Sequence, residues 1–280
     1  MHSGSSGCRR QPEPNRAKRA ILAASLSFTA LIASRPGFAE EPEAAPDRPD
    51  ASDSTSIMQP GWAQLELGAL VSRENETDTA VATPFVVRIG LAEPIELRLG
   101  GDGFRLQSTG EGSEAGIGDV SMGFKVRFFD EGTFYPSLGI EPVLIVPIAS
   151  HARGLGSGRP TFLGALLASK DLFAGLHADA NLAVNAVGIP DRSGEFHPQG
   201  LASLSLSRPL LDGALTPFAE VYGQTGEEPG DPITGAVDFG VVVLAHRRAA
   251  IDVAVDIGLT EAAPRFTGTV GVTLLLGRVH

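Results

Sequence analysis

The feature that most constrains the fold is an alternation of apolar and polar residues with a period of two, which runs from Pro60 to the end of the chain. Near the C-terminus, for example, Ile251 and Val253 lie on one face of an extended chain and Asp252 and Ala254 lie on the other. Successive side chains of a β-strand point to opposite faces of the sheet, so this pattern indicates strands rather than helices. The sequence therefore predicts an all-β protein.

Turn-forming residues divide the alternating region into about twelve candidate strands. Several of these strands reach about ten residues, which is the length that a tilted strand needs to cross a lipid bilayer. The expected strands cover residues 61–71, 81–91, 94–100, 117–129, 135–149, 160–169, 172–187, 199–208, 214–223, 233–245, 249–259 and 266–279.

The connections between these strands alternate in length. Long polar or glycine-rich segments, such as residues 101–116 and 150–159, follow the odd-numbered strands, whereas short joints such as Lys170–Asp171 follow the even-numbered ones. Outer-membrane barrels have long extracellular loops and short periplasmic turns. The pattern thus predicts a transmembrane up-and-down antiparallel β-barrel with its apolar face toward lipid and its polar face toward the lumen. A secreted soluble β protein, with the apolar face inward, is the alternative.

The N-terminal region predicts export to the bacterial outer membrane. Basic residues precede the apolar run Ala20–Ala33, and a stretch of small residues ends at Ala39, which is the layout of a secretory signal. We therefore expect residues 1–39 to be a signal peptide that is cleaved. Residues 40–59 are acidic and rich in proline, which predicts a disordered lead, and residues 60–280 form the expected barrel.

Composition and motifs exclude several classes of function. The net charge of −11 argues against nucleic acid as a partner, and a single cysteine permits neither an internal disulfide nor a cysteine-rich zinc site. We find no nucleophile–base pair and no histidines with metal-ligand spacing, so we expect no enzymatic activity, no cofactor and no metal. The expected partners are outer-membrane lipid, a small-molecule solute and, during biogenesis, the barrel-assembly and periplasmic chaperone machinery.

Charged residues on the polar faces of the strands are candidates to line the lumen. Basic residues concentrate on the early strands and acidic residues on the late ones, which would create an electric field across the lumen that orients polar solutes. The alternative is that the early charges form cross-strand ion pairs that fill the interior, whereas the late acidic residues have no basic partner. The candidates are Arg88, Glu96, Arg98, Asp119, Lys125, Arg127, Glu141, His177, Asp179, Glu220, Asp238, Asp252 and Asp256.

Several segments carry a family resemblance. Val86–Gly100 has the order Arg-x-Gly-Leu, short turn, Glu-Leu-Arg; Gly116–Phe128 begins with Gly-x-Gly-Asp; Tyr135–Ser150 ends in a proline corner; and Leu176–Asn185 and the last hairpin follow the same pattern. From Trp62 onward the chain resembles an outer-membrane β-barrel family of transporters of the meta-pathway of phenol degradation. The resemblance implies a barrel for passive uptake of small solutes, among them aromatic ones. A non-transporting structural barrel of the outer membrane is the alternative function.

Overall fold

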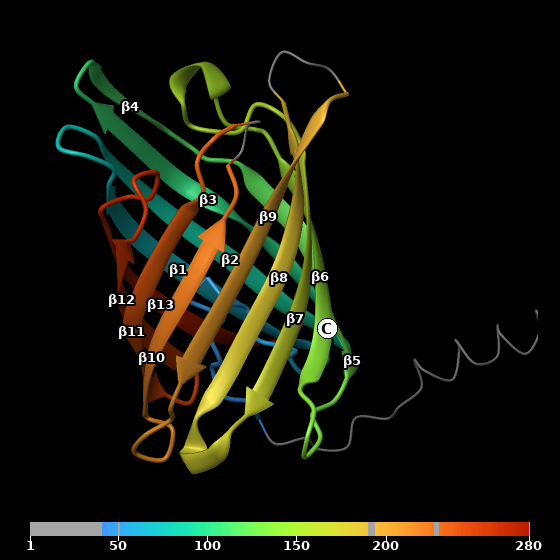
Figure 1. Cartoon of the computed structure of the whole chain (residues 1–280). Helices are drawn as coiled ribbons and strands as arrows, with labels where there is room; N and C mark the ends of the chain where they lie inside the picture. The colour runs from blue at the N-terminus through green and yellow to red at the C-terminus, as the bar shows by residue number, and fades with distance from the viewer. Residues whose placement is uncertain (1–40, 50, 190–193, 227–229, 280) are drawn as a thin grey trace, which may run out of the picture. The chain divides into compact units, whose positions relative to one another are not determined.

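The alternating region folds into strands that follow one another around a barrel (Figure 1). The computed structural model describes residues 41–49, 51–189, 194–226 and 230–279, so the expected signal peptide lies outside the described residues. The strands are β1 (Trp62–Arg73), β2 (Thr79–Ala92), β3 (Ile95–Thr109), β4 (Gly112–Gly116), β5 (Val120–Phe129), β6 (Ser137–Val146), β7 (Thr161–Asp171), β8 (His177–Gly188), β9 (Phe196–Ser207), β10 (Leu215–Gln224), β11 (Thr234–His246), β12 (Ala249–Gly258) and β13 (Phe266–Arg278).

The sheet closes on itself. Strand β1 pairs antiparallel with β13 along its whole length, and every pairing in the described part of the barrel is antiparallel. Twelve strands form the wall, because β4 pairs only with β3. The all-β, up-and-down barrel of about twelve strands that the alternation predicts is therefore confirmed. The described residues include two short 3-10 turns, η1 (His151–Arg153) and η2 (Phe173–Gly175), and no helix that is long and apolar enough to cross a membrane.

Strand β3 is the element that differs most from expectation. It was expected to end at Gly100, but it continues to Thr109 and forms a hairpin with β4 (Figure 1). Residues 110–111 connect the two strands, and a two-residue turn that contains glycine suits a β-hairpin. The segment expected to be a long loop therefore includes a pair of strands that lengthens the wall at the end of the barrel opposite the short turns.

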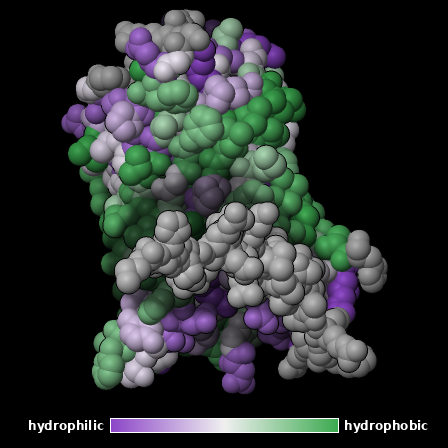
Figure 2. All heavy atoms as spheres, turned by 90° about the vertical axis from the view of Figure 1, so that its right-hand side faces the viewer, coloured by the Kyte–Doolittle hydropathy of each residue, from purple (hydrophilic) through white to green (hydrophobic). Residues whose placement is uncertain are grey.

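The faces of the wall are inverted relative to those of a soluble barrel. Val253 is 49% exposed on the outside of β12, whereas its neighbours Asp252 and Ala254 are 1% and 5% exposed. Figure 2 shows hydrophobic residues over the middle of the wall and hydrophilic residues toward both ends. Apolar residues outside and polar residues inside are the arrangement of a membrane barrel, since lipid surrounds the wall. The prediction of a membrane barrel is confirmed, and the soluble alternative is wrong.

The outward position of Val253 leads to a testable prediction about stability. Replacing it with arginine places a charge on the lipid-facing side of β12, which costs about 2–4 kcal/mol near the middle of a bilayer. We expect Val253→Arg to lower the free energy of unfolding by that amount in lipid vesicles, measured by urea denaturation. Glu111→Arg, at the tip of the β3–β4 hairpin, is the control and should change little. Equal stabilities for Val253→Arg and the wild type would contradict a lipid-facing wall.

Candidate functional site in the barrel lumen

The lumen contains a part of the chain itself, residues 42–49 and 51–59, which we call the lumen segment. It enters at the end of the barrel with the short turns, where the Ala44 amide donates a hydrogen bond to the Arg247 carbonyl at 2.7 Å. Its middle reaches the far wall, where the Ser52 hydroxyl lies 2.8 Å from that of Ser203. It returns to the same end, where the Met58 amide donates to Glu96 at 2.8 Å. Both ends of the segment thus lie at the rim that faces the periplasm in an outer-membrane barrel.

The prediction of a disordered lead over residues 40–59 is wrong for the described residues of the lumen segment. Composition argued for disorder because the segment has too few apolar side chains to build a core. The structure holds it instead through polar contacts with the wall, such as the Thr55 amide to the Ser169 hydroxyl at 2.8 Å and the Asp53 amide to Asn181 at 2.7 Å. Ser52 and Thr55 are each only 3% exposed. The missing core is replaced by hydrogen bonds and ion pairs.

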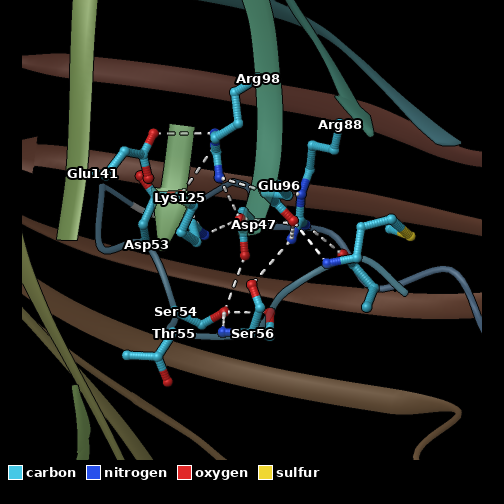
Figure 3. Close-up of polar contacts among 12 residues, drawn as sticks. Asp47, Asp53, Ser54, Thr55, Ser56, Arg88, Glu96, Arg98, Lys125 and Glu141 are labelled. Atoms are coloured by element: carbon cyan, nitrogen blue, oxygen red, sulfur yellow. Dashed lines mark hydrogen bonds and ion pairs between the residues drawn. The ribbon is translucent and has the colours of Figure 1, made fainter. Parts of the chain in front are cut away.

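A cluster of charges fixes the segment at Asp47 (Figure 3). The Asp47 carboxylate lies 3.2 Å from Arg88 and 2.6 Å from Arg98, and it also pairs with the Lys125 ammonium group. The three basic residues come from β2, β3 and β5, and the period of two places their side chains on the lumen face. The side chains of Asp47 and Lys125 are 2% and 0% exposed. The segment and the wall therefore meet in a water-poor ionic contact.

The wall supplies its own carboxylates to the same cluster. Glu66 and Glu96 lie 3.2 and 2.9 Å from Arg88, and Glu141 lies 3.0 Å from Arg98. These pairs agree with the alternative interpretation, in which ion pairs among the early strands fill the interior. The early strands therefore do not form a purely basic wall, and the hypothesised electric field across the lumen lacks its basic side. Five of the predicted candidates come together in this cluster: Arg88, Glu96, Arg98, Lys125 and Glu141.

The lumen segment supplies the negative charges that pair with the Lys125 ammonium group. Among the carboxylates of the described chain, only Asp47 and Asp53 of the lumen segment lie within ion-pair distance of its ammonium group. Burial alone would raise the pKa of the Asp47 carboxyl, but the positive charges of Arg88, Lys125 and Arg98 outweigh it and hold this pKa well below its usual range. Asp47 is thus ionised at neutral pH and balances a buried cation that has no carboxylate of the described wall within ion-pair distance.

The opposite wall also uses the lumen segment. The Arg48 side chain lies 3.4 Å from Asp252 on β12, and the Ala51 amide donates to Glu220 on β10 at 2.6 Å. The Ser52 hydroxyl donates to Glu220 as well. The expectation that the acidic residues of the late strands lack a basic partner is therefore wrong for Asp252, because the sequence analysis had placed no part of the N-terminal region inside the barrel.

The remaining candidates lie away from these contacts. Asp119 accepts hydrogen bonds from Ala149 and Ser157 and so holds the β6–β7 loop. Near the short turns, Arg127 pairs with the exposed Asp130 at 3.1 Å, and His177 and Asp179 lie together at 3.4 Å. Asp238 and Asp256 face each other on β11 and β12. The residues that the sequence analysis missed are Glu66 and, in the lumen segment, Asp47, Arg48, Ser52 and Asp53.

Two further features shape the lumen. At the periplasmic rim, Ala44 and Met58 of the segment pack with Trp62, Leu275 and Leu244 of the wall and form a small apolar seal. Toward the other end lies a cavity of about 570 Å³, which is lined by apolar, charged and uncharged polar residues, among them Ile145, Val187, Asp102, Arg105 and Gln199. The lumen segment therefore occupies the periplasmic side of the lumen, and a cavity lies above it. In the part of the chain that the structure describes, no three acidic, histidine or cysteine side chains gather in a way that would hold a metal ion.

The ionic cluster predicts how the segment is held. Replacing Asp47 with asparagine removes a buried negative charge beside Lys125, and breaking a buried ion pair is strongly destabilising. We expect Asp47→Asn to speed hydrogen exchange of the backbone amides of residues 44–58 by about tenfold or more. Glu43→Gln is the matched control, because the Glu43–Arg247 pair is half exposed and contributes little. Unchanged exchange in Asp47→Asn would mean that this cluster does not anchor the segment.

Similar solved structures support the geometry. An outer membrane channel from Pseudomonas putida F1 matches with a TM-score of 0.65 and 14% identity over 82% of this chain and 100% of that one. The KdgM porin, solved in complex with disordered oligogalacturonate, matches with a TM-score of 0.51 and 7% identity over 75% and 98% of the two chains. The NanC porin matches with a TM-score of 0.50 and 10% identity over 76% and 98%. At these identities the likeness concerns the fold, which is that of outer-membrane channels and porins.

No curated protein sequence matches this chain. A family match does cover most of it, from Pro46 in the lumen segment to Leu276 in β13. The resemblance seen in the sequence is thereby confirmed: through residues 46–276, the chain belongs to the family described as "Putative MetA-pathway of phenol degradation", whose members are outer-membrane barrels.

Proposed function

We propose that the protein is an outer-membrane channel for passive passage of small solutes, which its own lumen segment closes. The observation that carries the proposal is that polar and ionic contacts hold the segment, with an apolar seal only at the periplasmic rim. Water and solute can replace such contacts when the segment moves, whereas a well-packed apolar core would have no substitute. The cavity above the segment, about 570 Å³, is of the size of small-molecule sites in proteins.

We propose further that the small solutes of the channel include aromatic compounds. The family description, which refers to phenol degradation, supports aromatic solutes, and Ile145 and Val187 in the lining of the cavity offer an apolar surface to a ring. We further propose that residues 1–39 are removed during export, and that barrel-assembly and chaperone machinery insert the chain into outer-membrane lipid. The exposed apolar belt supports the lipid partner.

A non-transporting structural barrel is the second candidate. The dense ionic contacts around Asp47 and the apolar seal favour it, because together they hold the lumen segment in the lower lumen. The two candidates differ in one respect that can be measured: a channel conducts when the lumen segment is free to move, and a structural barrel does not.

A disulfide between the lumen segment and the wall tests this difference. The hydroxyl oxygens of Ser52 and Ser203 lie 2.8 Å apart, and the only cysteine of the chain, Cys8, lies within the expected signal peptide. We expect Ser52→Cys/Ser203→Cys to lock the segment when it is oxidised. In planar bilayers the oxidised variant should conduct little, and a reducing agent should raise the current to the wild-type value.

The single variant Ser52→Cys is the control, and its current should not respond to the reducing agent. Folding of each variant is checked by its faster migration on a denaturing gel before boiling, as closed barrels show. Equal currents in the oxidised and reduced states would mean that the segment does not close a channel. Absence of current in all folded variants, wild type included, would favour the structural barrel.

A further inference from the structure

Three carboxylates stand side by side in the lumen, on the wall of the late strands. Glu220 on β10 lies opposite Asp238 on β11, which in turn lies opposite Asp256 on β12. We call these three residues the acidic row. Side chains directly opposite one another on antiparallel strands are about 5 Å apart, and like charges in such positions repel. A proton held by one of the carboxyl groups, or a partner that carries positive charge, relieves such repulsion.

The partners present at the two ends of the row are uncharged. Glu220 accepts hydrogen bonds from the Ser52 hydroxyl and the Ala51 amide, and the Tyr222 hydroxyl donates to Asp256 at 3.0 Å. No arginine or lysine of the described residues forms an ion pair with any member of the row. These hydrogen bonds satisfy oxygen atoms of the outer two carboxyl groups, and none of the donors carries a positive charge.

The central member has a vacant acceptor. Asp238 is only 4% exposed, and its buried Oδ1 atom has no hydrogen-bond partner among the described residues. A buried carboxylate oxygen without a donor is unfavourable, because water no longer solvates it and nothing replaces the water. Asp238 lies between two other carboxylates, so the group that best satisfies it both donates hydrogen bonds and carries a positive charge.

The same wall already binds such a group elsewhere. Asp252, four residues before Asp256 on β12 and on the same face, receives the guanidinium of Arg48 at 3.4 Å. Arg48 belongs to the lumen segment and not to the wall, so Asp252 binds a cation that comes from outside the wall. Asp256 and Tyr222 are partly exposed, so the Asp256 end of the row is in contact with solvent.

The spacing of the row favours an organic cation over a metal ion. Neighbouring strands lie about 4.8 Å apart, which places the two outer carboxylates about 10 Å from each other. A calcium ion needs several oxygen atoms at about 2.3–2.6 Å from one point, and no such convergent group is present in the described chain. An aliphatic diamine, with N–H donors at both ends of a short chain, matches carboxylates that are spread along a line.

We propose that the acidic row binds a small aliphatic diamine through its ammonium groups, one of them donating to Asp238. This inference rests on the proposed function, because it names organic cations as solutes of the channel. It adds a binding site on the path that such a solute would follow past the lumen segment.

Calorimetry on the full-length protein in detergent micelles tests the proposal. Putrescine, which is 1,4-diaminobutane, is the probe, and butane-1,4-diol is its uncharged analogue. We expect heat of binding from putrescine and none from the diol. In Asp238→Asn/Asp256→Asn the affinity for putrescine should fall by about tenfold or more, because hydrogen bonds to charged groups are lost. Glu111→Gln, an exposed change of the same charge in the β3–β4 hairpin, should bind as the wild type does.

Several results would overturn the proposal. Equal affinity for putrescine in the double variant would place the binding elsewhere, and equal binding of the diol would remove the role of charge. Calcium binding that the double variant loses, without putrescine binding, would make the row a metal site. If the double variant does not show the folded gel mobility, the partly exposed Asp256→Asn alone serves as the second variant, and an unchanged affinity there counts equally against the site.

The calorimetric result is separate from the conductance result. A redox-sensitive current in the locked variant without putrescine binding would overturn the diamine site and leave the channel in place. Putrescine binding that depends on Asp238, in a barrel that never conducts, would leave the site in place and overturn the channel.

Discussion

The rest of the structure depends on hydrogen bonding of the backbone in lipid. Inside a bilayer no water is available, so each backbone amide and carbonyl of a spanning segment needs a partner in the protein. Pairing of β1 with β13 meets this requirement by closing the sheet. Closure then fixes the rest, because a closed wall surrounded by lipid keeps its apolar face outside. The polar face is left inside, and the interior must be stabilised by hydrogen bonds and ion pairs instead of by an apolar core.

The lumen segment provides partners for the polar groups of that interior. Its composition, with many Asp, Ser and Pro residues, would suit solvent in most proteins, but here each polar type has a partner on the wall. Asp47 balances Lys125, Arg48 reaches Asp252, and Ser52 donates to Glu220. The segment therefore supplies counter-charges and hydrogen-bond partners to both the early and the late strands of the wall.

The period of two was enough to predict the strands, because it follows from side-chain direction. The up-and-down order and the inverted faces needed further observations, namely the alternating loop lengths, the strand lengths and the secretory signal. The boundaries of β3 were missed, since the turn at residues 110–111 looked like part of a longer loop. The contacts of Asp47 and Arg48 were missed for a different reason. Composition measures whether a segment can fold alone, and the lumen segment folds only against partners that lie far away in the sequence, such as Lys125 and Asp252. Glu66 illustrates the same limit on the wall, because its pairing with Arg88 depends on which strand neighbours β1.

The lumen segment enters and leaves the barrel at the same rim, and this has a consequence for how the chain can change length. A strand that threaded the barrel from one end to the other would have to match the height of the wall. A bend that is pushed in from one side has no such requirement, because additional residues only deepen it. Insertions and deletions next to Pro49 or Ala51 would then alter how far the bend rises without disturbing β1, so the degree of closure could evolve independently of the wall.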